Sequence, residues 1–449
     1  MTAPDRTRPP ATLPTPSLAL PTFRERVLDG GLRVRVARMP RLPDVAIRLV
    51  LDAGAGAEDP GEAGVAALAA RVLPEGAAGR TAPGMAEWLD HLGAGFSAGV
   101  SHDSVQLGMH ALSDTVDEAL DYLAAVVLAP AFFPEEVERV RDERIDEILR
   151  LRDDPAEVAA EALAAVLFGA HPYGRPVGGT EATLSRLGSA GVRAFWERTY
   201  GARSAVLVAA GDIDPDGFAA AAATRFGAWA PGAEPGRVAP SPEPLPGPIH
   251  LIDRPGSRQS EIRVGTVGLA RGAPDEVAAL VMNAVLGGLF SSRLNLNLRE
   301  EKGWTYGVRS GFTRRREAGP FVVRAAVETE KTARGFEEVL AEIRSMTERP
   351  PDEEELALAR SALKLSLPRE FETTSLVASK EAERIAYGLP EDWWERFPSA
   401  VTAVGRDDVV AVAERYLEPA RLRLLAVADA AATQAGLAGL GPVEVSVTS

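Results

Sequence analysis

The sequence predicts an α+β protein of two homologous domains, each an antiparallel-rich β-sheet covered by helices on one face. Three observations support this fold class. The order of strand-like and helix-like segments recurs in the two halves, a proline-rich segment divides them, and 449 residues are long for one hydrophobic core. We therefore expect a clam-shell arrangement of two domains, 23–230 and 249–449, with a disordered leader at 1–22 and a linker at 231–248.

The first half opens with strand-like runs and closes on a continuous apolar strand. Between them lie two helical segments, an alternating strand pair, an amphipathic helix and further helices. In chain order, the main segments are the strands 23–38 and 45–58, the helices 61–73 and 85–94, the strand pair 93–101 and 104–112, the helix 114–128 and the closing strand 204–212.

The second half repeats this order, which indicates a duplication at domain scale. Its glycine-rich piece 286–292, LGGLFSS, lacks the Lys-Ser/Thr of a phosphate-binding loop, so we expect a bend between two helices there. The segments are the strands 249–256 and 260–270, the helices 275–288 and 292–303, the strands 304–313 and 320–329, the helix 332–346, a long helical stretch and the closing strand 422–429.

Composition excludes several kinds of protein. The absence of cysteine rules out disulfides, thiolate metal sites and cysteine nucleophiles, and a formal charge of −15 argues against a nucleic-acid partner. Seven prolines in the linker prevent a helix and favour an extended connector. The leader does not look like a signal peptide, and no later segment looks long and apolar enough to span a membrane. We expect a cytoplasmic protein without a membrane partner.

Three stretches carry a resemblance to a known family: LGGLFSSRLNLNLREEKGWTYGV (286–308), FGAHPYGRPVGGTEATL (168–184) and FETTSLVASKEAERIAYGLPEDWW (371–394). They resemble the pitrilysin–insulinase (inverzincin) metallopeptidases, especially the bacterial branch that is similar to the mitochondrial processing peptidase. With the duplicated halves, the similarity extends over about residues 23–430. The resemblance implies a zinc peptidase fold with an H-x-x-E-H motif in the first long helix of the N-terminal domain.

In this chain the inverted zinc motif is degenerate. Ala67 stands in place of the first histidine, Ala70 in place of the glutamate base and Arg71 in place of the second histidine. A methyl group cannot ligate a cation and a guanidinium repels one, so we expect no metal here. Glu147 falls where the resemblance places the third zinc ligand, but one carboxylate is a poor site, and a salt bridge is its expected role.

No histidine pair offers a replacement site. No two of the five histidines lie three or four residues apart, so none can form the one-face pair that helical zinc ligation needs. Each is expected to be an ordinary structural or surface residue, and the segment HPYG at 171–174 predicts a turn. The five are His91, His102, His110, His171 and His250.

The resemblance carries over intact a second pair, Arg299 and Tyr306. In the family, these residues lie in the non-zinc half and reach across a cavity toward the metal. A tyrosine hydroxyl can stabilise the oxyanion of a peptide carbonyl under attack, and an arginine fork can hold substrate carbonyls. An exposed sheet edge such as 96–101 holds the peptide in catalytic halves, but without a facing metal we expect a structural strand here.

These features predict the non-catalytic subunit of a heterodimeric zinc endopeptidase. Zinc is expected in a homologous partner chain with an intact H-x-x-E-H motif, and Arg299 and Tyr306 are expected to act in trans on unfolded peptide substrates. One alternative is a peptide-binding or structural scaffold subunit without a role in catalysis. Another is a self-contained hydrolase with an unrecognised site.

Overall fold

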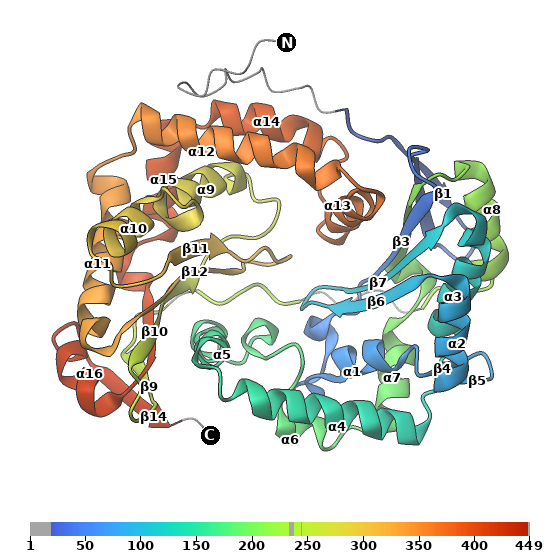
Figure 1. The fold of residues 1–449 in the computed structure, drawn as a ribbon, viewed down its shortest axis with the longest axis horizontal. Coiled ribbons are helices and arrows are strands. Elements are labelled where there is room, and N and C mark those ends of the chain that lie inside the picture. The colour runs from blue at the N-terminus through green and yellow to red at the C-terminus, as the bar shows by residue number, and fades with distance from the viewer. Residues whose placement is uncertain (1–18, 233–237, 244, 448–449) are drawn as a thin grey trace, which may run out of the picture.

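The computed structural model describes residues 19–232, 238–243 and 245–447. Most of the expected leader, 1–18, and the linker residues 233–237 and 244 lie outside the described residues. The two halves face each other around a ring-like molecule (Figure 1), in the clam-shell arrangement that the sequence predicts. The fold class, two homologous α+β domains, is confirmed.

The described strands of the first half form a six-stranded sheet with the order β1-β2-β8-β3-β7-β6. Only β2 and β8 pair in parallel, and the edge strand β6 is mostly exposed. The strands are β1 Phe23–Val27, β2 Arg33–Arg38, β3 Asp44–Leu51, β6 Gly95–Val100, β7 Val105–Leu112 and β8 Ala205–Gly211; β4 Gly76–Ala77 and β5 Arg80–Thr81 form a separate small hairpin.

The second half repeats this topology in the order β11-β12-β10-β13-β9-β14. The strands β11, β12, β10, β13 and β9 correspond to β6, β7, β3, β8 and β2, and the parallel pair recurs between β13 and β9. The outer strands differ, because β14 is parallel to β9 whereas β1 is antiparallel to β2. The strands are β9 Ile249–Asp253, β10 Gln259–Val267, β11 Val308–Phe312, β12 Pro320–Glu328, β13 Arg423–Ala428 and β14 Val443–Val447.

Helices surround both sheets. Those of the first half are α1 Val65–Val72, α2 Ala82–Leu92, α3 Val116–Leu128, α4 Pro134–Leu151, α5 Pro155–Phe168, α6 Glu181–Leu184, α7 Ser189–Thr199 and α8 Pro215–Phe226. Those of the second half are α9 Glu276–Asn283, α10 Arg293–Asn295, α11 Thr332–Glu348, α12 Glu353–Ser366, α13 Thr374–Ala386, α14 Trp393–Ala403, α15 Arg406–Tyr416 and α16 Ala430–Leu437.

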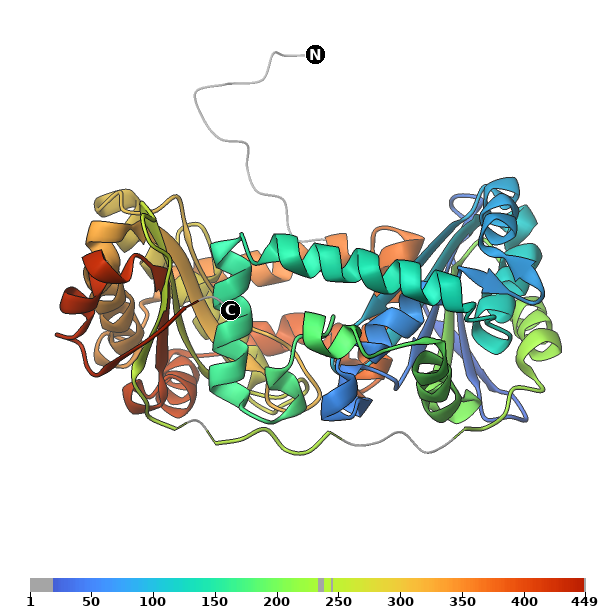
Figure 2. The same ribbon diagram turned by 90° about the horizontal axis from the view of Figure 1, so that it is seen from below.

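Each half covers one face of its own sheet and lends one helix to the other face of the partner sheet. The second-half helix α13 packs Val377 against Val208 of β8 in the first sheet. Reciprocally, the first-half helix α5 packs Leu163 and Leu167 against Leu425 of β13. In Figure 2, α4 (teal) runs from the first half toward the second, with α5 upright at its end. This exchange of helices ties the halves together by apolar burial.

Polar contacts also join the halves where the β11–β12 hairpin reaches the first half. The carboxylate of Asp103 accepts hydrogen bonds from the Tyr173 hydroxyl at 2.6 Å and from the backbone amide of Arg316 at 3.0 Å. The Tyr173 hydroxyl in turn accepts from the backbone amide of Glu317 at 3.1 Å. The guanidinium of Arg316 forms an ion pair with Asp52. We call Asp103, Tyr173 and the backbone amides of 316–317 the Asp103 network.

Two expectations about the region 276–308 need correction. The helical run Glu276–Glu301 does match a membrane span in length and composition, contrary to the prediction, and half of its most apolar window is buried inside the protein. The strand expected from 304 begins at Val308, because residues 304–307 form a loop. The predicted bend at 286–292 is confirmed between the π-helical turn Ala284–Gly288 and α10.

Candidate functional site

The helix that carries the degenerate zinc motif is α1. Its residues Val65, Leu68 and Val72 are buried in the core of the first half, which fixes the helix regardless of what its other positions carry. The backbone amides of Gly64 and Ala66 donate to the buried carboxylate of Glu58 at 3.1 and 2.9 Å, so an acidic group caps the positive end of the helix. Burial raises the pKa of Glu58 to about 7.

Arg71 and Glu147 meet at the expected metal position. Arg71 makes two hydrogen bonds to Glu147, Nη1 to Oε1 at 3.1 Å and Nη2 to Oε2 at 3.0 Å, and Arg144 adds a third at 2.9 Å. These hydrogen bonds, with that from Arg71 the strongest influence, lower the pKa of Glu147 below its ordinary value. The salt bridge expected for Glu147 is confirmed. The residues present do not fit zinc, because a guanidinium uses both carboxylate oxygens and alanines stand at positions 67 and 70.

Two of the buried or half-buried histidines make hydrogen bonds away from this position. Across 19–232, 238–243 and 245–447, no group of three or more His, Asp or Glu side chains is arranged to hold a metal. His102 is buried against the carbonyl of Arg175 at 3.0 Å, and burial lowers its pKa to about 4. His171 lies 2.8 Å from the carbonyl of Ala239 and begins the turn Pro172–Gly174, which the sequence predicts.

Arg299 and Tyr306 lie on either side of the turn that joins the second helical segment to β11. The Tyr306 side chain is 95% exposed, so its hydroxyl is accessible to a peptide or to another subunit. The Arg299 guanidinium lies 4.3 Å from the centroid of the Phe290 ring, and its Nε lies 3.5 Å from a carboxylate oxygen of Glu300. Phe290 therefore supports one face of this guanidinium and leaves edge donors available.

A buried amide fixes the start of β11 next to Tyr306. Asn295 donates to the carbonyl of Val308 at 2.8 Å and accepts from the Val308 amide at 3.0 Å. Gly303, at φ +65°, allows the chain to leave the helix, and the Trp304 amide donates to the carbonyl of Leu298 at 2.9 Å. Sequence reasoning missed the supporting roles of Asn295 and Phe290, although both lie within the stretch that carries the resemblance.

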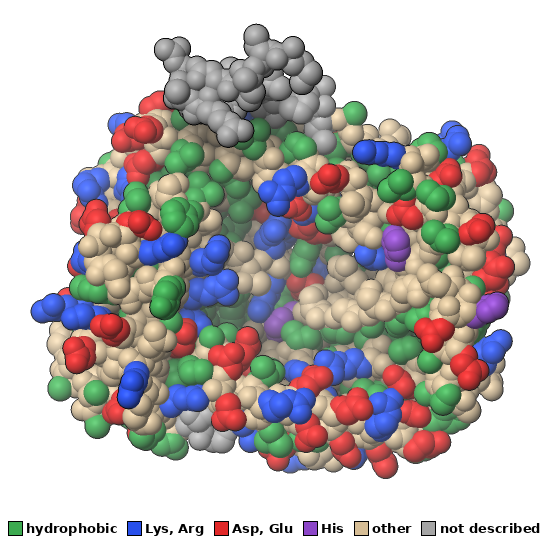
Figure 3. Space-filling model, in the orientation of Figure 1, with side chains coloured by type: hydrophobic (Ala, Val, Ile, Leu, Met, Phe, Trp, Pro, Cys, Tyr) green, Lys and Arg blue, Asp and Glu red, His purple; other side chains and the backbone are tan. Residues whose placement is uncertain are grey.

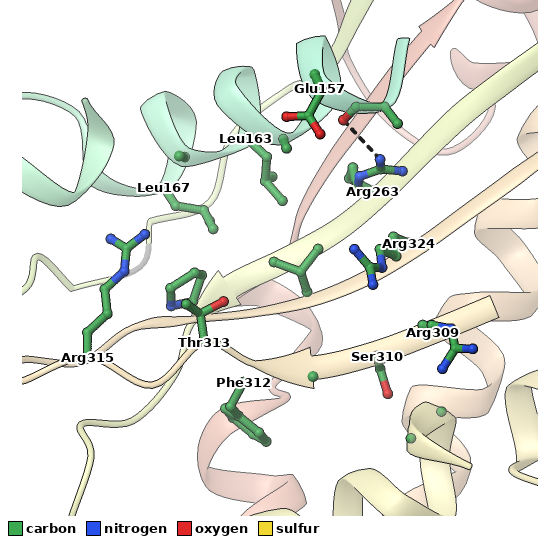
Figure 4. A pocket seen from close by; sticks show the side chains of 18 residues that line it. Glu157, Leu163, Leu167, Arg263, Arg309, Ser310, Phe312, Thr313, Arg315 and Arg324 are labelled. Atoms are coloured by element: carbon green, nitrogen blue, oxygen red, sulfur yellow. Dashed lines mark hydrogen bonds between the residues drawn. The ribbon is translucent and has the colours of Figure 1, made fainter. Parts of the chain in front are cut away.

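A cavity of about 590 Å³ lies between α5 and the inner face of the second sheet. Its lining includes α5, the edge strand β11 and the neighbouring strand β12 (Figure 4). Figure 3 shows that the molecule is hollowed in its middle when it is seen as in Figure 1, and that Lys and Arg side chains gather on the side of the hollow where β11 and β12 lie. This cavity was not predicted from the sequence, because its walls come from both halves.

Comparisons with known proteins agree with this geometry. A family model described as "Insulinase (Peptidase family M16)" matches residues 33–181, and one described as "Peptidase M16 inactive domain" matches residues 189–363. The two matches do not overlap, and together they cover more than two thirds of the chain.

Similar proteins span nearly the same length. An uncharacterized zinc protease of Mycobacterium tuberculosis is 29% identical over 360 residues, which make up 78% of this chain and 81% of that protein. One of Rickettsia felis is 26% identical over 398 residues, 88% of this chain and 94% of that protein.

Solved structures extend the similarity to three dimensions. The crystal structure of a peptidase M16 inactive domain from Pseudomonas fluorescens matches with a TM-score of 0.87 at 26% identity and covers 92% of this chain and 99% of that one. A protease from Helicobacter pylori shares the fold, with a TM-score of 0.84 at 16% identity over 91% of this chain and 100% of that one.

Proposed function

Because the chain belongs to the insulinase family of peptidases (M16), we propose that it is the non-catalytic, zinc-lacking subunit of a heterodimeric zinc endopeptidase. Its partner is a homologous chain with an intact H-x-x-E-H motif, which supplies the zinc ion and the general base. This chain binds and orients an unfolded peptide and contributes Arg299 and Tyr306 to the partner's site.

The observation that carries the proposal is the contrast between two sites in one chain. At the zinc position, Arg71 pairs with Glu147 through both carboxylate oxygens, which leaves this carboxylate without a free ligand atom. At the opposite site, Tyr306 is exposed and Arg299 is held against Phe290 with donors to spare. A purely structural subunit has no need of this exposed pair.

The chemistry of the pair suits a peptide that is being cleaved. A phenolic hydroxyl is a neutral donor that can hydrogen-bond to a carbonyl oxygen as negative charge develops on it. A guanidinium presents several fixed donors and stays charged, so it suits the backbone carbonyls of an extended substrate. The hydrogen bonds of Asn295 to Val308 hold the Tyr306 loop in place for this task.

The test mixes the purified chain with a homologous chain that carries the intact motif and measures cleavage of a fluorogenic peptide. We expect Tyr306→Phe to lower the rate about ten- to a thousandfold, as removal of an oxyanion donor does. Arg299→Ala should lower it as well. The matched control is Tyr416→Phe, which removes a hydroxyl that donates to Asp275 and not one on the Tyr306 loop.

The outcomes separate the alternatives. Full activity of both variants in the mixture would refute the catalytic role of the pair. A chain that stimulates no homologue and is recovered only in a larger assembly would favour a structural scaffold. Peptide cleavage by the isolated chain, together with stoichiometric zinc, would favour a self-contained hydrolase.

A further inference from the structure

Three arginines lie side by side on neighbouring strands of the second sheet. Arg309 of β11 is the register partner of Arg324 of β12, and Arg324 is the register partner of Arg263 of β10. Directly opposed residues of antiparallel strands point to the same face of the sheet. We call these three residues the arginine row, and Figure 4 shows their side chains beside the cavity under α5.

Like charges that are directly opposed destabilise a sheet unless anions compensate them. Arg263, 5% exposed, is compensated, since it pairs with Glu261 at 2.6 Å and donates to the carbonyl of Ala156 at 3.1 Å. Arg309 and Arg324 are exposed and, within the part of the chain that the structure describes, have no carboxylate oxygen within 4.0 Å. Two adjacent guanidinium groups therefore lack a protein anion.

The surroundings make this end of the cavity positive in a strongly acidic chain. Four arginines line the cavity: the three of the arginine row and Arg315. Among the described residues, the lining contains one carboxylate, that of Glu157 on α5. The chain as a whole carries a formal charge of −15, so this concentration of positive charge runs against its general surface. Focusing of charge in a cleft raises the local concentration of ligands of the opposite sign.

We infer that the arginine row binds a carboxylate of the peptide substrate, with Arg309 and Arg324 as the two donors. This inference rests on the proposed function and adds a preference for acidic peptide segments. Cβ atoms of opposed residues lie about 5 Å apart, so two guanidinium groups can share one carboxylate through charge-assisted hydrogen bonds. The carboxylate comes from an aspartate or glutamate side chain, or from the carboxyl terminus of the peptide.

The position of the row on an edge strand supports a peptide as the ligand. β11 is the outer strand of the second sheet, and an extended peptide can add to such an edge through backbone hydrogen bonds. Gly311, two residues beyond Arg309 and on the same face of the strand, has nothing within 4 Å of where a Cβ would be, so this face is open beside the row. A peptide along this edge brings its side chains to the row.

The test measures binding of fluorescein-labelled extended peptides to the full chain by anisotropy. One peptide carries several Glu residues and a free carboxyl terminus, a second has the same sequence with an amidated terminus, and a third has Gln in place of Glu and an amidated terminus. Each is titrated against the wild-type chain, Arg309→Gln, Arg324→Gln and the control Arg334→Gln. Arg334 is an exposed arginine on α11, the helix that packs against the opposite face of the same sheet.

We expect each row variant to weaken binding of the acidic peptide about ten- to a hundredfold, as loss of a charge-assisted hydrogen bond does. Binding of the neutral peptide should stay unchanged, and Arg334→Gln should affect neither. If amidation alone removes the effect, the bound group is the carboxyl terminus; if it does not, it is a side chain.

Stability distinguishes a ligand role from a structural one. Removing one of two opposed like charges should leave the melting temperature of the row variants unchanged or raise it, whereas loss of a structural arginine lowers it. Equal affinity for acidic and neutral peptides, or equal weakening of both by the row variants, would overturn the inference and leave the proposed function intact. Failure to bind any of the peptides would overturn both.

Discussion

The Asp103 network provides a measurable link between the halves of the molecule. Its carboxylate is buried and accepts from the Tyr173 hydroxyl at 2.6 Å and the Arg316 amide at 3.0 Å. Asp103→Asn keeps the shape but turns one acceptor oxygen into an NH₂ donor. Because the Arg316 amide can only donate, the remaining oxygen must face it, and the NH₂ group then faces the Tyr173 hydroxyl, whose proton loses its charged acceptor.

The expected cost follows from these two bonds. Hydrogen bonds to a charged group contribute about 1.5–3 kcal/mol each, and a buried donor left without an acceptor costs about 1–3 kcal/mol. We therefore expect Asp103→Asn to lower the free energy of unfolding by about 3 kcal/mol. Tyr173→Phe removes one of the two bonds to Asp103 and also the acceptor of the Glu317 amide, and should cost about 3 kcal/mol.

The assay is urea-induced unfolding of both single variants and the double variant, followed by circular dichroism. Because the two residues share one hydrogen bond, the double variant should be about 1–2 kcal/mol more stable than the sum of the single losses predicts. Asp90→Asn, at an exposed aspartate on α2, is the matched control. A cost of Asp103→Asn no larger than that of the control, or strictly additive losses, would refute the reasoning.

Two further predictions concern titration and metal binding. The pKa of His102 in the folded chain, about 4, lies below the ordinary value of 6.5, so the unfolded chain takes up this proton first. The contribution of neutral His102 to the free energy of unfolding is complete above pH 6.5 and is lost as the pH falls toward 4, by up to about 3 kcal/mol. In His102→Gln, the loss of unfolding free energy between pH 7 and 4.5 should therefore be about 2–3 kcal/mol smaller than in the wild-type chain. The second prediction concerns a triple variant that frees Glu147 from its bidentate partner: Ala67→His, Ala70→Glu and Arg71→His. This variant should bind about one zinc per chain by metal analysis, whereas Glu147→Gln in the same background should prevent zinc binding.

The order of elements could be predicted because each segment carries its own periodicity. The alternating pattern of β12 can be recognised in the sequence without any partner strand. In the structure, Phe321, Val323 and Ala325 are buried and Arg324 is exposed. The order of the strands within each sheet was not predicted, because it depends on pairing between distant segments. One edge was predicted: the segment expected at a sheet edge, 96–101, lies on the edge strand β6 except for its last residue.

What could not be predicted depends on contacts between distant segments. The apolar faces of α5 and α13 are ordinary amphipathic patterns, and nothing in them indicates that each covers the sheet of the other half. The arginine row needs the register of three strands that lie up to 61 positions apart in the sequence, from Arg263 to Arg324. The Asp103 network likewise joins residues whose pairing has no local signal.

The helix α1 explains how a chain can lose a metal site and keep its fold. Val65, Leu68 and Val72 are buried in the core, whereas positions 67 and 71, four residues apart on one face, are only partly covered. Stability and metal binding therefore belong to different faces of the same helix, and ligand positions can change at little cost in packing. The exception is Ala70, which is buried, so a glutamate there must displace neighbours or find a partner. Zinc binding thus depends on positions 67, 71 and 147, whereas restoring the glutamate base at position 70 also needs space and a partner in the core.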